Sequence, residues 1–213
     1  RGECVQACRW NYEIREKTRG GEWYPVEQDG RGSYILNSKD LNMICHLKEM
    51  AEAGVFSFKI EGRMKSEYYL ATIVNAYRRA LDDLSKTGEN NGELYLEEVN
   101  KTMHRAFTTA YAFGKNDETE NHDDTQSNGS RTFIAMVLDY DEKNRRVLVE
   151  MRNRFKVGDQ LEVLTPGDYL NAVVKVDDMT DENGKEVCDA YIVQQKLWIK
   201  TAVPLSPGDI LRK

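Results

Sequence analysis

Hydrophobic and polar positions follow two different periodicities along this chain, and the change between them divides it into two parts. Up to residue 113 many apolar positions recur at helical spacing, whereas after residue 130 they fall in short runs separated by turn residues. The stretch between the two parts is polar and acidic, which is typical of a linker. The pattern predicts an α/β region at 1–113, a linker at 114–130 and a small all-β domain at 131–213.

The first part is organised around a predicted strand–helix–strand unit. Strand-like runs at 33–36 and 55–60 flank apolar positions at helical spacing, and Gly54 stands where a helix would end. In α/β folds ligands bind at the carboxyl ends of strands. The candidate binding residues that follow the two runs are Asn37, Ser38, Lys39, Asp40, Glu61, Gly62, Arg63 and Lys65. The simpler interpretation is a helix cap (Ser38 or Asp40) and a surface ion pair between Glu61 and Arg63.

Two more helices and a hairpin are predicted in this part. The apolar stripe at 66–82 predicts an amphipathic helix that Ser66 can cap. Residues 94–107 suggest another helix, with His104 and Arg105 near its end, where cations are favourable to the helix dipole. Residues 9–26 alternate around a Gly-Gly pair, which predicts a β-hairpin.

The second part predicts a small closed β-barrel, an architecture that often serves as an accessory binding module. Pro-Gly and Asn-Gly pairs separate the expected strands, which are 133–138, 146–151, 160–164, 172–176, 190–193 and 197–201. Two phrases, FKVGDQLEVLTP and LSPGDILRK, place Gly-Asp directly before a strand.

Basic residues gather in the first hairpin of this part, namely Lys143, Arg145, Arg146, Arg152, Arg154 and Lys156. A solvated charged face is the usual explanation of such a cluster. Contact with an RNA phosphate backbone is the sharper alternative. The formal net charge of −6 gives no general argument for nucleic-acid binding.

Composition indicates a soluble cytoplasmic protein without a membrane partner. No apolar run approaches the length needed to cross a bilayer, and no signal peptide is visible. Four cysteines at uneven spacing do not resemble a secreted disulfide framework. The first residue is Arg, so we expect a fragment or a processed product.

Cys4 and Cys8 form a C-x3-C pair, which is close enough to share one metal ion or cluster. Thiolates suit zinc and iron–sulfur sites. Two cysteines do not complete such a site, and Cys45, His46 or Cys188 would join it only if the fold brings them near. Two free cysteines are the alternative.

Several of these phrases together resemble one known family. GECVQACRW, DGRGSYILNSKDL and AGVFSFKIEGRMKSEYYLATIVNAYRRALD resemble the signature half of the collagenase-like peptidase family U-32. The resemblance continues through HRAFTTAYAFG and the two Gly-Asp phrases, so it covers nearly the whole chain. Within the family, the chain is most similar to the branch of prephenate-dependent tRNA uridine hydroxylation.

The resemblance implies a fold and a cofactor. Members resemble a (β/α)8 barrel, followed in this branch by a small β-barrel, so residues 1–113 would be the C-terminal portion of the larger barrel. A complete barrel takes about 250 residues, and the N-terminal part would be missing. Cys4 and Cys8 would be two of the four ligands of a [4Fe-4S] cluster in the full-length parent, with none expected in this fragment alone. Cys45 would be a core residue and Cys188 a surface residue.

The activity that the resemblance implies is hydroxylation of carbon 5 of the wobble uridine of tRNA, with prephenate as the oxygen source. Prephenate is a dicarboxylate, which Arg63 or Arg31 would bind, with Lys39, Lys65 and Asn37 as further substrate-binding residues. The candidate catalytic residues are Asp29, Asp40, Glu61 and Arg63, whose carboxylates would orient the cations or move protons. The basic residues from Arg145 to Lys156 would contact tRNA, and the isolated fragment is expected to be inactive.

Two other functions stay open. The family's name indicates a peptidase, which needs an activated nucleophile or a metal-bound water. The sequence has neither G-x-S-x-G nor H-E-x-x-H, and Cys8 pairs with His46 only if folding joins them. The second alternative is a non-catalytic RNA-binding module that relies on the basic hairpin.

Overall fold

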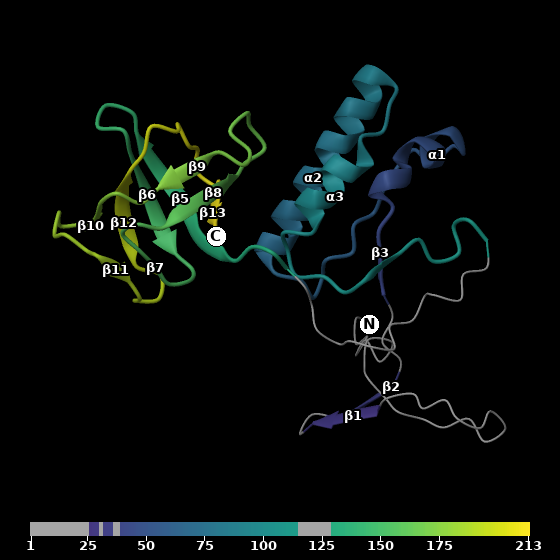
Figure 1. Ribbon diagram of the computed structural model, residues 1–213, viewed down its shortest axis with the longest axis horizontal. Helices are drawn as coiled ribbons and strands as arrows, with labels where there is room; N and C mark the ends of the chain where they lie inside the picture. The colour runs from purple at the N-terminus through teal and green to yellow at the C-terminus, as the bar shows by residue number, and fades with distance from the viewer. Residues whose placement is uncertain (1–25, 30–31, 36–38, 115–128) are drawn as a thin grey trace.

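The computed structural model describes residues 26–29, 32–35, 39–114 and 129–213, which form a helical unit and a β-domain (Figure 1). Of the two strands within 26–35, it describes the backbone alone. Nearly all of the predicted hairpin at 9–26 and most of the predicted linker lie outside the described residues. In the described ranges, no helix has both the length and the apolar character that crossing a membrane requires.

The helical unit combines short strands with three α-helices. Its elements are β1 (Val26–Asp29), β2 (Gly32–Ile35), β3 (Asp40–Leu41), the 3-10 helix η2 (Ile44–His46), α1 (Leu47–Glu52), α2 (Glu67–Thr87), α3 (Gly92–Val99) and β4 (Phe107–Thr108). β1 and β2 pair in antiparallel fashion, whereas β3 and β4 pair in parallel. Parallel strands need a long crossover connection, and here the helices supply it. The β3–β4 pair with its helices is therefore an α/β unit.

This unit differs from the predicted strand–helix–strand arrangement. The prediction of a strand at 55–60 is wrong, since these residues form no strand and Phe56 is 97% exposed. The strand that pairs with β3 is β4, which lies about fifty residues after the strand predicted at 55–60. Asp40 N–H donates to Ala106 O (2.9 Å) and Asn42 N–H donates to Thr108 O (3.0 Å), so β4 fills the ladder of β3. The predicted strand at 33–36 overlaps β2, which pairs with β1.

Helix α2 confirms the prediction at 66–82 and extends beyond it. Ser66 Oγ accepts a hydrogen bond from Tyr69 N–H (3.2 Å), and Gly88 ends the helix with a φ of 75°, in the left-handed region that favours glycine. The predicted helix at 94–107 is shorter, because α3 ends at Val99. His104 and Arg105 lie beyond that end, so their assignment to the helix dipole is wrong.

The β-domain is a curled antiparallel sheet (Figure 1). Its strands are β5 (Phe133–Asp141), β6 (Arg146–Met151), β7 (Phe155–Lys156), β8 (Gln160–Leu164), β9 (Val173–Lys175), β10 (Met179–Asp181), β11 (Asp189–Ala190), β12 (Lys196–Lys200) and β13 (Ile210–Arg212). The order of the large sheet is β10-β12-β6-β5-β13-β8-β9, and β7 pairs with β11. The strands predicted at 146–151 and 160–164 match β6 and β8. The strand predicted at 190–193 is wrong beyond Ala190, and Val193 is 83% exposed.

The two Gly-Asp phrases form the same turn. Gly158 and Gly208 both have a φ of 95°, a conformation that favours glycine. In each turn the carboxylate accepts a hydrogen bond from the backbone three residues earlier, Asp159 from Lys156 N–H (3.0 Å) and Asp209 from Ser206 N–H (2.8 Å). The repeated phrase therefore fixes two corners of the sheet.

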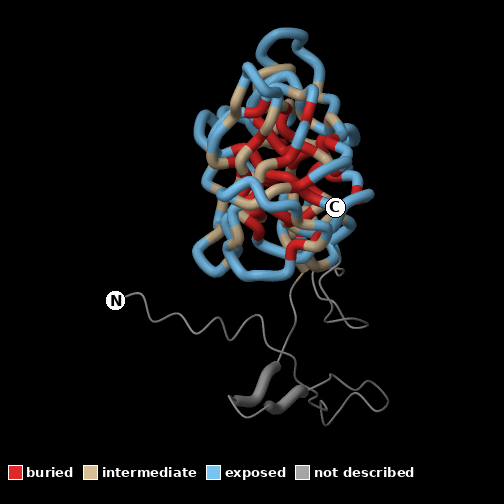
Figure 2. Tube along the Cα trace, turned by 90° about the vertical axis from the view of Figure 1, so that its left-hand side faces the viewer, coloured by how far each residue is buried: buried red, intermediate tan, exposed pale blue. Residues whose placement is uncertain are grey.

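Side chains at every second position of the strands form the core of the β-domain. Val147, Val149 and Met151 of β6 are buried, whereas the residues between them are half-buried. They belong to one cluster that draws on most strands of the sheet. Figure 2 shows buried residues in the interior and exposed residues mainly on the outer loops.

A buried charge network joins the two units. Arg212 of β13 is fully buried and pairs with Glu98 of α3 and with Glu162 of β8, each at 2.7 Å. Lys101 Nζ lies 3.0 Å from Glu98 and 2.8 Å from Glu162. Burial opposes the charged form of Glu98, but hydrogen bonding and the charge of Arg212 lower its pKa below the ordinary value. The network fixes α3 against the sheet.

Candidate active site beside the β3–β4 pair

Asp40 is the centre of a small charged cluster in the helical unit. The Arg105 guanidinium lies 2.7 Å from Asp40 Oδ1, and Arg105 N–H donates to Oδ2 (3.1 Å). Lys65 Nζ lies 3.6 Å from the same Oδ2 and 4.7 Å from the centre of the Tyr69 ring. The fold therefore brings together Asp40 and Lys65, two of the residues selected from the sequence, although 24 residues separate them.

The electrostatics of this cluster keep the carboxylate charged. Burial alone would raise the pKa of Asp40, but hydrogen bonds from Arg105 and the charges of Arg105 and Lys65 together lower it. The three side chains are between 12% and 21% exposed, so solvent screens them weakly.

A cavity of about 320 Å³ lies beside the β3–β4 pair. Its lining residues are Lys39, Asn42, Cys45, His46, Leu96, Phe107, Thr108 and Thr109. Lys39 is another of the residues predicted to bind substrate. The lining therefore combines a cation, hydroxyl groups and an amide with an apolar wall, a composition suited to a small polar ligand.

Asn42 is held rigidly in this lining. Its Oδ1 accepts hydrogen bonds from Tyr77 O–H (2.8 Å) and from Ile44 N–H (3.0 Å), and Tyr77 in turn accepts one from Met43 N–H (3.0 Å). These contacts fix the amide orientation, and its buried Nδ2 has no hydrogen-bond partner in the described residues. A buried donor without a partner is costly. Nδ2 is therefore a group that a ligand acceptor would satisfy.

The structure describes three more of the candidate residues, namely Glu61, Arg63 and, by its backbone, Asp29. Glu61 Oε1 accepts a hydrogen bond from Arg63 N–H (3.0 Å), and both residues are exposed. Asp29 is the last residue of β1, of which only the backbone is described. Arg31 and Asn37 lie outside the described residues.

Cysteine and histidine chemistry is sparse in the described ranges. Cys4 and Cys8 lie outside them, and within them no group of three or more His, Cys, Asp or Glu residues could hold a metal ion. Cys188 is exposed, and Cys45 is half-buried. Burial, together with the charges of Glu93 and Glu49, raises the pKa of the Cys45 thiol, which disfavours the thiolate that a nucleophile requires.

The predicted basic hairpin is divided between two ends of a strand. β6 spans Arg146–Met151, so Lys143 and Arg145 lie before it and Arg152, Arg154 and Lys156 after it. At about 3.3 Å per residue, roughly 20 Å separates the two groups.

Several of these basic residues are already paired with carboxylates. Arg152 pairs with Glu67 (3.3 Å) and Glu150 (3.1 Å), and Arg154 pairs with Asp189. Arg146 lies 3.5 Å from Asp178.

Sequence reasoning did not select three residues of the site, namely Asn42, Tyr77 and Arg105. Arg105 reaches Asp40 across 65 positions, and Tyr77 reaches Asn42 across 35. Contacts over such separations depend on how the helices pack, which no local pattern encodes. Only the helical stripe that contains Tyr77 indicated that it faces the interior.

Comparisons with known proteins agree along the whole chain. The model of peptidase family U32 matches residues 1–122, and that of the peptidase family U32 C-terminal domain matches residues 130–212. The chain is 32% identical to tRNA hydroxylation protein P1 of Bacillus subtilis over 100% of its length, and 28% identical to tRNA hydroxylation protein P of Escherichia coli over 98%. It spans 51% of the length of each of these two relatives.

Two further matches cover shorter parts. A collagenase of Porphyromonas gingivalis is 38% identical over 38% of this chain and 19% of its own length. The crystal structure of the C-terminal domain of a U32 peptidase from Geobacillus thermoleovorans is 30% identical, covers 38% of this chain and 99% of its own, and has a TM-score of 0.37. The two family models together cover nearly every residue, and this chain belongs to peptidase family U32.

Proposed function

We propose that the protein hydroxylates carbon 5 of the wobble uridine in tRNA, in the cytoplasm, with prephenate as co-substrate. The observation that carries this proposal is the likeness, over essentially the full chain, to two proteins named for tRNA hydroxylation. Because the chain spans about half of those relatives, the activity is proposed for the complete protein.

The helical unit would be the C-terminal portion of a (β/α)8 barrel. Support comes from the parallel pairing of β3 with β4 and from the helical crossover between them, which are the repeating elements of such a barrel. The curled sheet of the β-domain would be the small barrel that follows. In this arrangement the Asp40 cluster and the adjoining cavity would belong to the substrate site.

The cavity beside the β3–β4 pair suits a carboxylate ligand. Lys39 supplies a cation, and Asn42 Nδ2 supplies a donor that is already oriented. We therefore assign Lys39 and Asn42 to carboxylate binding. Lys65 stays a candidate, which Asp40 would position together with Arg105. Arg63 and Arg31 stay as further candidates for the second carboxylate.

Cys4 and Cys8 would supply two of the four ligands of a [4Fe-4S] cluster. Thiolates are the right donor type and two are too few, so the complete set would need cysteines from elsewhere in the protein. A cluster bound there would supply one-electron chemistry. Every role assigned above to Lys39, Asn42 and Asp40 is independent of it.

The test is to count hydroxylated uridine in tRNA. The complete protein would be expressed in cells that lack their own tRNA uridine hydroxylation, and 5-hydroxyuridine-derived nucleosides would be measured by mass spectrometry. We expect the unaltered protein to restore them, and Lys39→Ala, Arg63→Ala and Cys4→Ala to reduce them at least tenfold. Lys48→Ala, which removes an exposed cation paired with Glu89, is the matched control and should leave them unchanged. Absence of hydroxylated nucleosides with the unaltered protein would contradict the proposal.

Peptidase activity is the second candidate function, favoured by the collagenase match. The raised pKa of the Cys45 thiol and the absence of a metal-binding group in the described ranges give it no support there. The same preparation would be incubated with gelatin. Cleavage without tRNA hydroxylation would favour the peptidase.

A further inference from the structure

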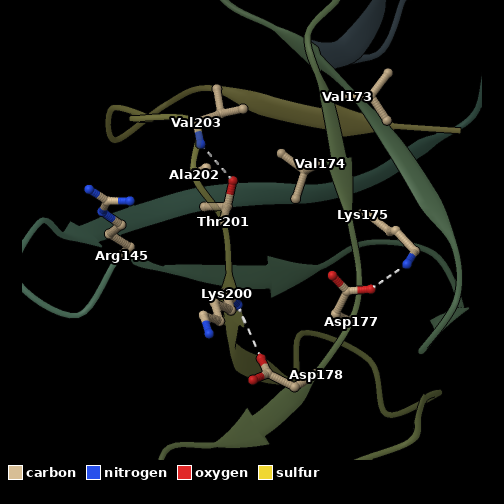
Figure 3. A pocket seen from close by; sticks show the side chains of 10 residues that line it. All are labelled: Arg145, Val173, Val174, Lys175, Asp177, Asp178, Lys200, Thr201, Ala202 and Val203. Carbon is tan, nitrogen blue, oxygen red and sulfur yellow. Dashed lines mark hydrogen bonds and ion pairs between the residues drawn. The ribbon is translucent and has the colours of Figure 1, made fainter.

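One end of the β-domain sheet carries a groove of about 500 Å³ that the proposed activity does not use. It lies between β9 and the chain that follows β12, and the turn between β5 and β6 borders it (Figure 3). Its lining residues are Arg145, Val173, Val174, Lys175, Asp177, Asp178, Lys200, Thr201, Ala202 and Val203.

Hydrogen bonds hold the border of this groove in place. Thr201 N–H donates to Arg145 O (2.9 Å), which ties the β5–β6 turn to the chain after β12. Within the turn, Asn144 N–H and Nδ2 donate to the Asp141 carboxylate (3.0 and 2.7 Å). Arg145 has a φ of 50°, so the turn geometry sets where its side chain leaves the backbone. The backbone of Arg145 is therefore held in place, and its exposed side chain extends from this turn.

The charges of the groove leave two cations available. Asp177 is paired with Lys175 (2.7 Å), and Asp178 accepts Lys200 N–H (3.2 Å) (Figure 3). Asp178 also lies 3.5 Å from Arg146. Within the described ranges, neither the Arg145 guanidinium nor the Lys200 ammonium has an ion-pair partner. Asp177 and Asp178 therefore each have a positively charged partner, whereas two cations of the lining, Arg145 and Lys200, have no ion-pair partner in the described ranges. This surplus of positive charge stands on a chain whose net charge is −6.

Part of the groove lining is apolar. Val173 is 55% exposed and Val174 is buried, while Ala202 and Val203 belong to the chain that follows β12. A ligand that fits has anionic groups joined to a compact, partly apolar body. A nucleotide chain has this composition, since each phosphate is joined to a ribose and a base.

We propose that this groove binds the phosphate backbone of RNA, with Arg145 and Lys200 each contacting a phosphate and the valine surface contacting a ribose or base. The inference rests on the proposed function, since tRNA is the RNA that the protein would meet. It separates the basic residues predicted from the sequence into a binding end, with Arg145, and a second end, where Arg152 and Arg154 serve ion pairs within the protein.

The experiment measures tRNA binding by the complete protein over a range of salt concentrations. Two variants remove the same charge from opposite ends of β6, Arg145→Gln with Lys200→Gln at the groove and Arg154→Gln with Lys156→Gln at the other end. We expect the groove variant to bind about tenfold more weakly at physiological salt and its slope of log K against log salt to fall by about 1.4, or 0.7 for each single-strand phosphate contact. The variant at the other end should bind as the unaltered protein does.

The possible outcomes separate this inference from the proposed function. If the groove variant binds tRNA normally while the unaltered protein restores hydroxylated uridine, the groove assignment is overturned and the function stands. If the unaltered protein does not bind tRNA, both are overturned. Polyglutamate that binds as tightly as tRNA at equal salt would identify an acidic protein as the ligand and would also overturn the assignment.

Discussion

The helical unit and the β-domain bury their apolar residues to very different degrees. The β-domain gathers buried side chains from most strands of its sheet into one cluster. The helical unit has a smaller core around Ile44, Leu47 and Ile73, and exposes Leu41 (63%), Phe56 (97%), Met64 (69%), Met103 (54%) and Phe113 (60%). A sheet that curls on itself covers its own inner face, whereas a two-stranded parallel pair with helices cannot. Within the described residues, the β-domain therefore has a complete core, whereas the helical unit leaves large apolar side chains exposed.

The largest effect should come from the junction between the two regions. Arg212→Met removes a fully buried cation and leaves Glu98 and Glu162 without their main partner. Breaking a buried ion pair in this way typically costs about 3 to 5 kcal/mol, so the free energy of unfolding in urea should fall by that amount. Arg154→Met breaks an exposed pair and should change little. Equal stability of the two variants would show that the network does not join the units.

The next effect contrasts a buried residue of the β-domain with an exposed residue of the helical unit. Leu161 of β8 is completely buried, so Leu161→Ala should lower the free energy of unfolding by about 2 to 5 kcal/mol. Phe56→Ala removes a larger side chain that is 97% exposed, and surface substitutions usually stay within about 0.5 kcal/mol. Thermal and urea unfolding of both variants measure the difference. A large loss from Phe56→Ala would contradict the comparison by showing that Phe56 has a packing partner.

The smallest of the three effects concerns the Asp40 cluster and depends on pH. Asp40→Asn should lower the free energy of unfolding at neutral pH by about 1 to 3 kcal/mol, because a charged hydrogen-bond acceptor is lost. The pKa of Asp40 is lowered in the folded chain, so the stabilisation is present above the ordinary carboxyl pKa of about 3.9 and is lost as the pH falls through the lower folded value.

Urea unfolding at several pH values tests this. The difference between the unaltered chain and Asp40→Asn should be constant from neutral pH to about pH 5 and should close in stronger acid. Asp177→Asn, which removes an exposed carboxylate paired with Lys175, is the control. A difference that widens in acid would contradict the lowered pKa.

Local signals predicted the β-domain well and the helical unit less well. β6 and β8 have the predicted bounds because alternation in each strand reports one buried face. The Ser66 cap and the apolar stripe predicted α2, because a stripe at helical spacing likewise reports one buried face. The run at 55–60 has strand-like composition but no strand partner, and composition alone does not reveal whether a partner exists.

Part of the site was also predictable. Asp40, Lys39 and Lys65 were selected because charged residues follow an apolar run, and the fold places all three beside β3. The basic cluster shows the limit of the same reasoning. Six cations close in sequence form two groups at opposite ends of β6, because an extended strand carries its two ends apart.

By itself, the sequence determined the periodicity of each part, the Gly-Asp turns, the cap of α2 and the family, since each of these depends on residues close together in the chain or on their identity alone. Tertiary structure alone decided that β3 pairs with β4, that Arg105 neutralises Asp40, that Tyr77 orients Asn42 and that Arg212 joins the units. These contacts join residues 35 or more positions apart. Their geometry follows from how helices and sheet pack against each other, so no local rule encodes them.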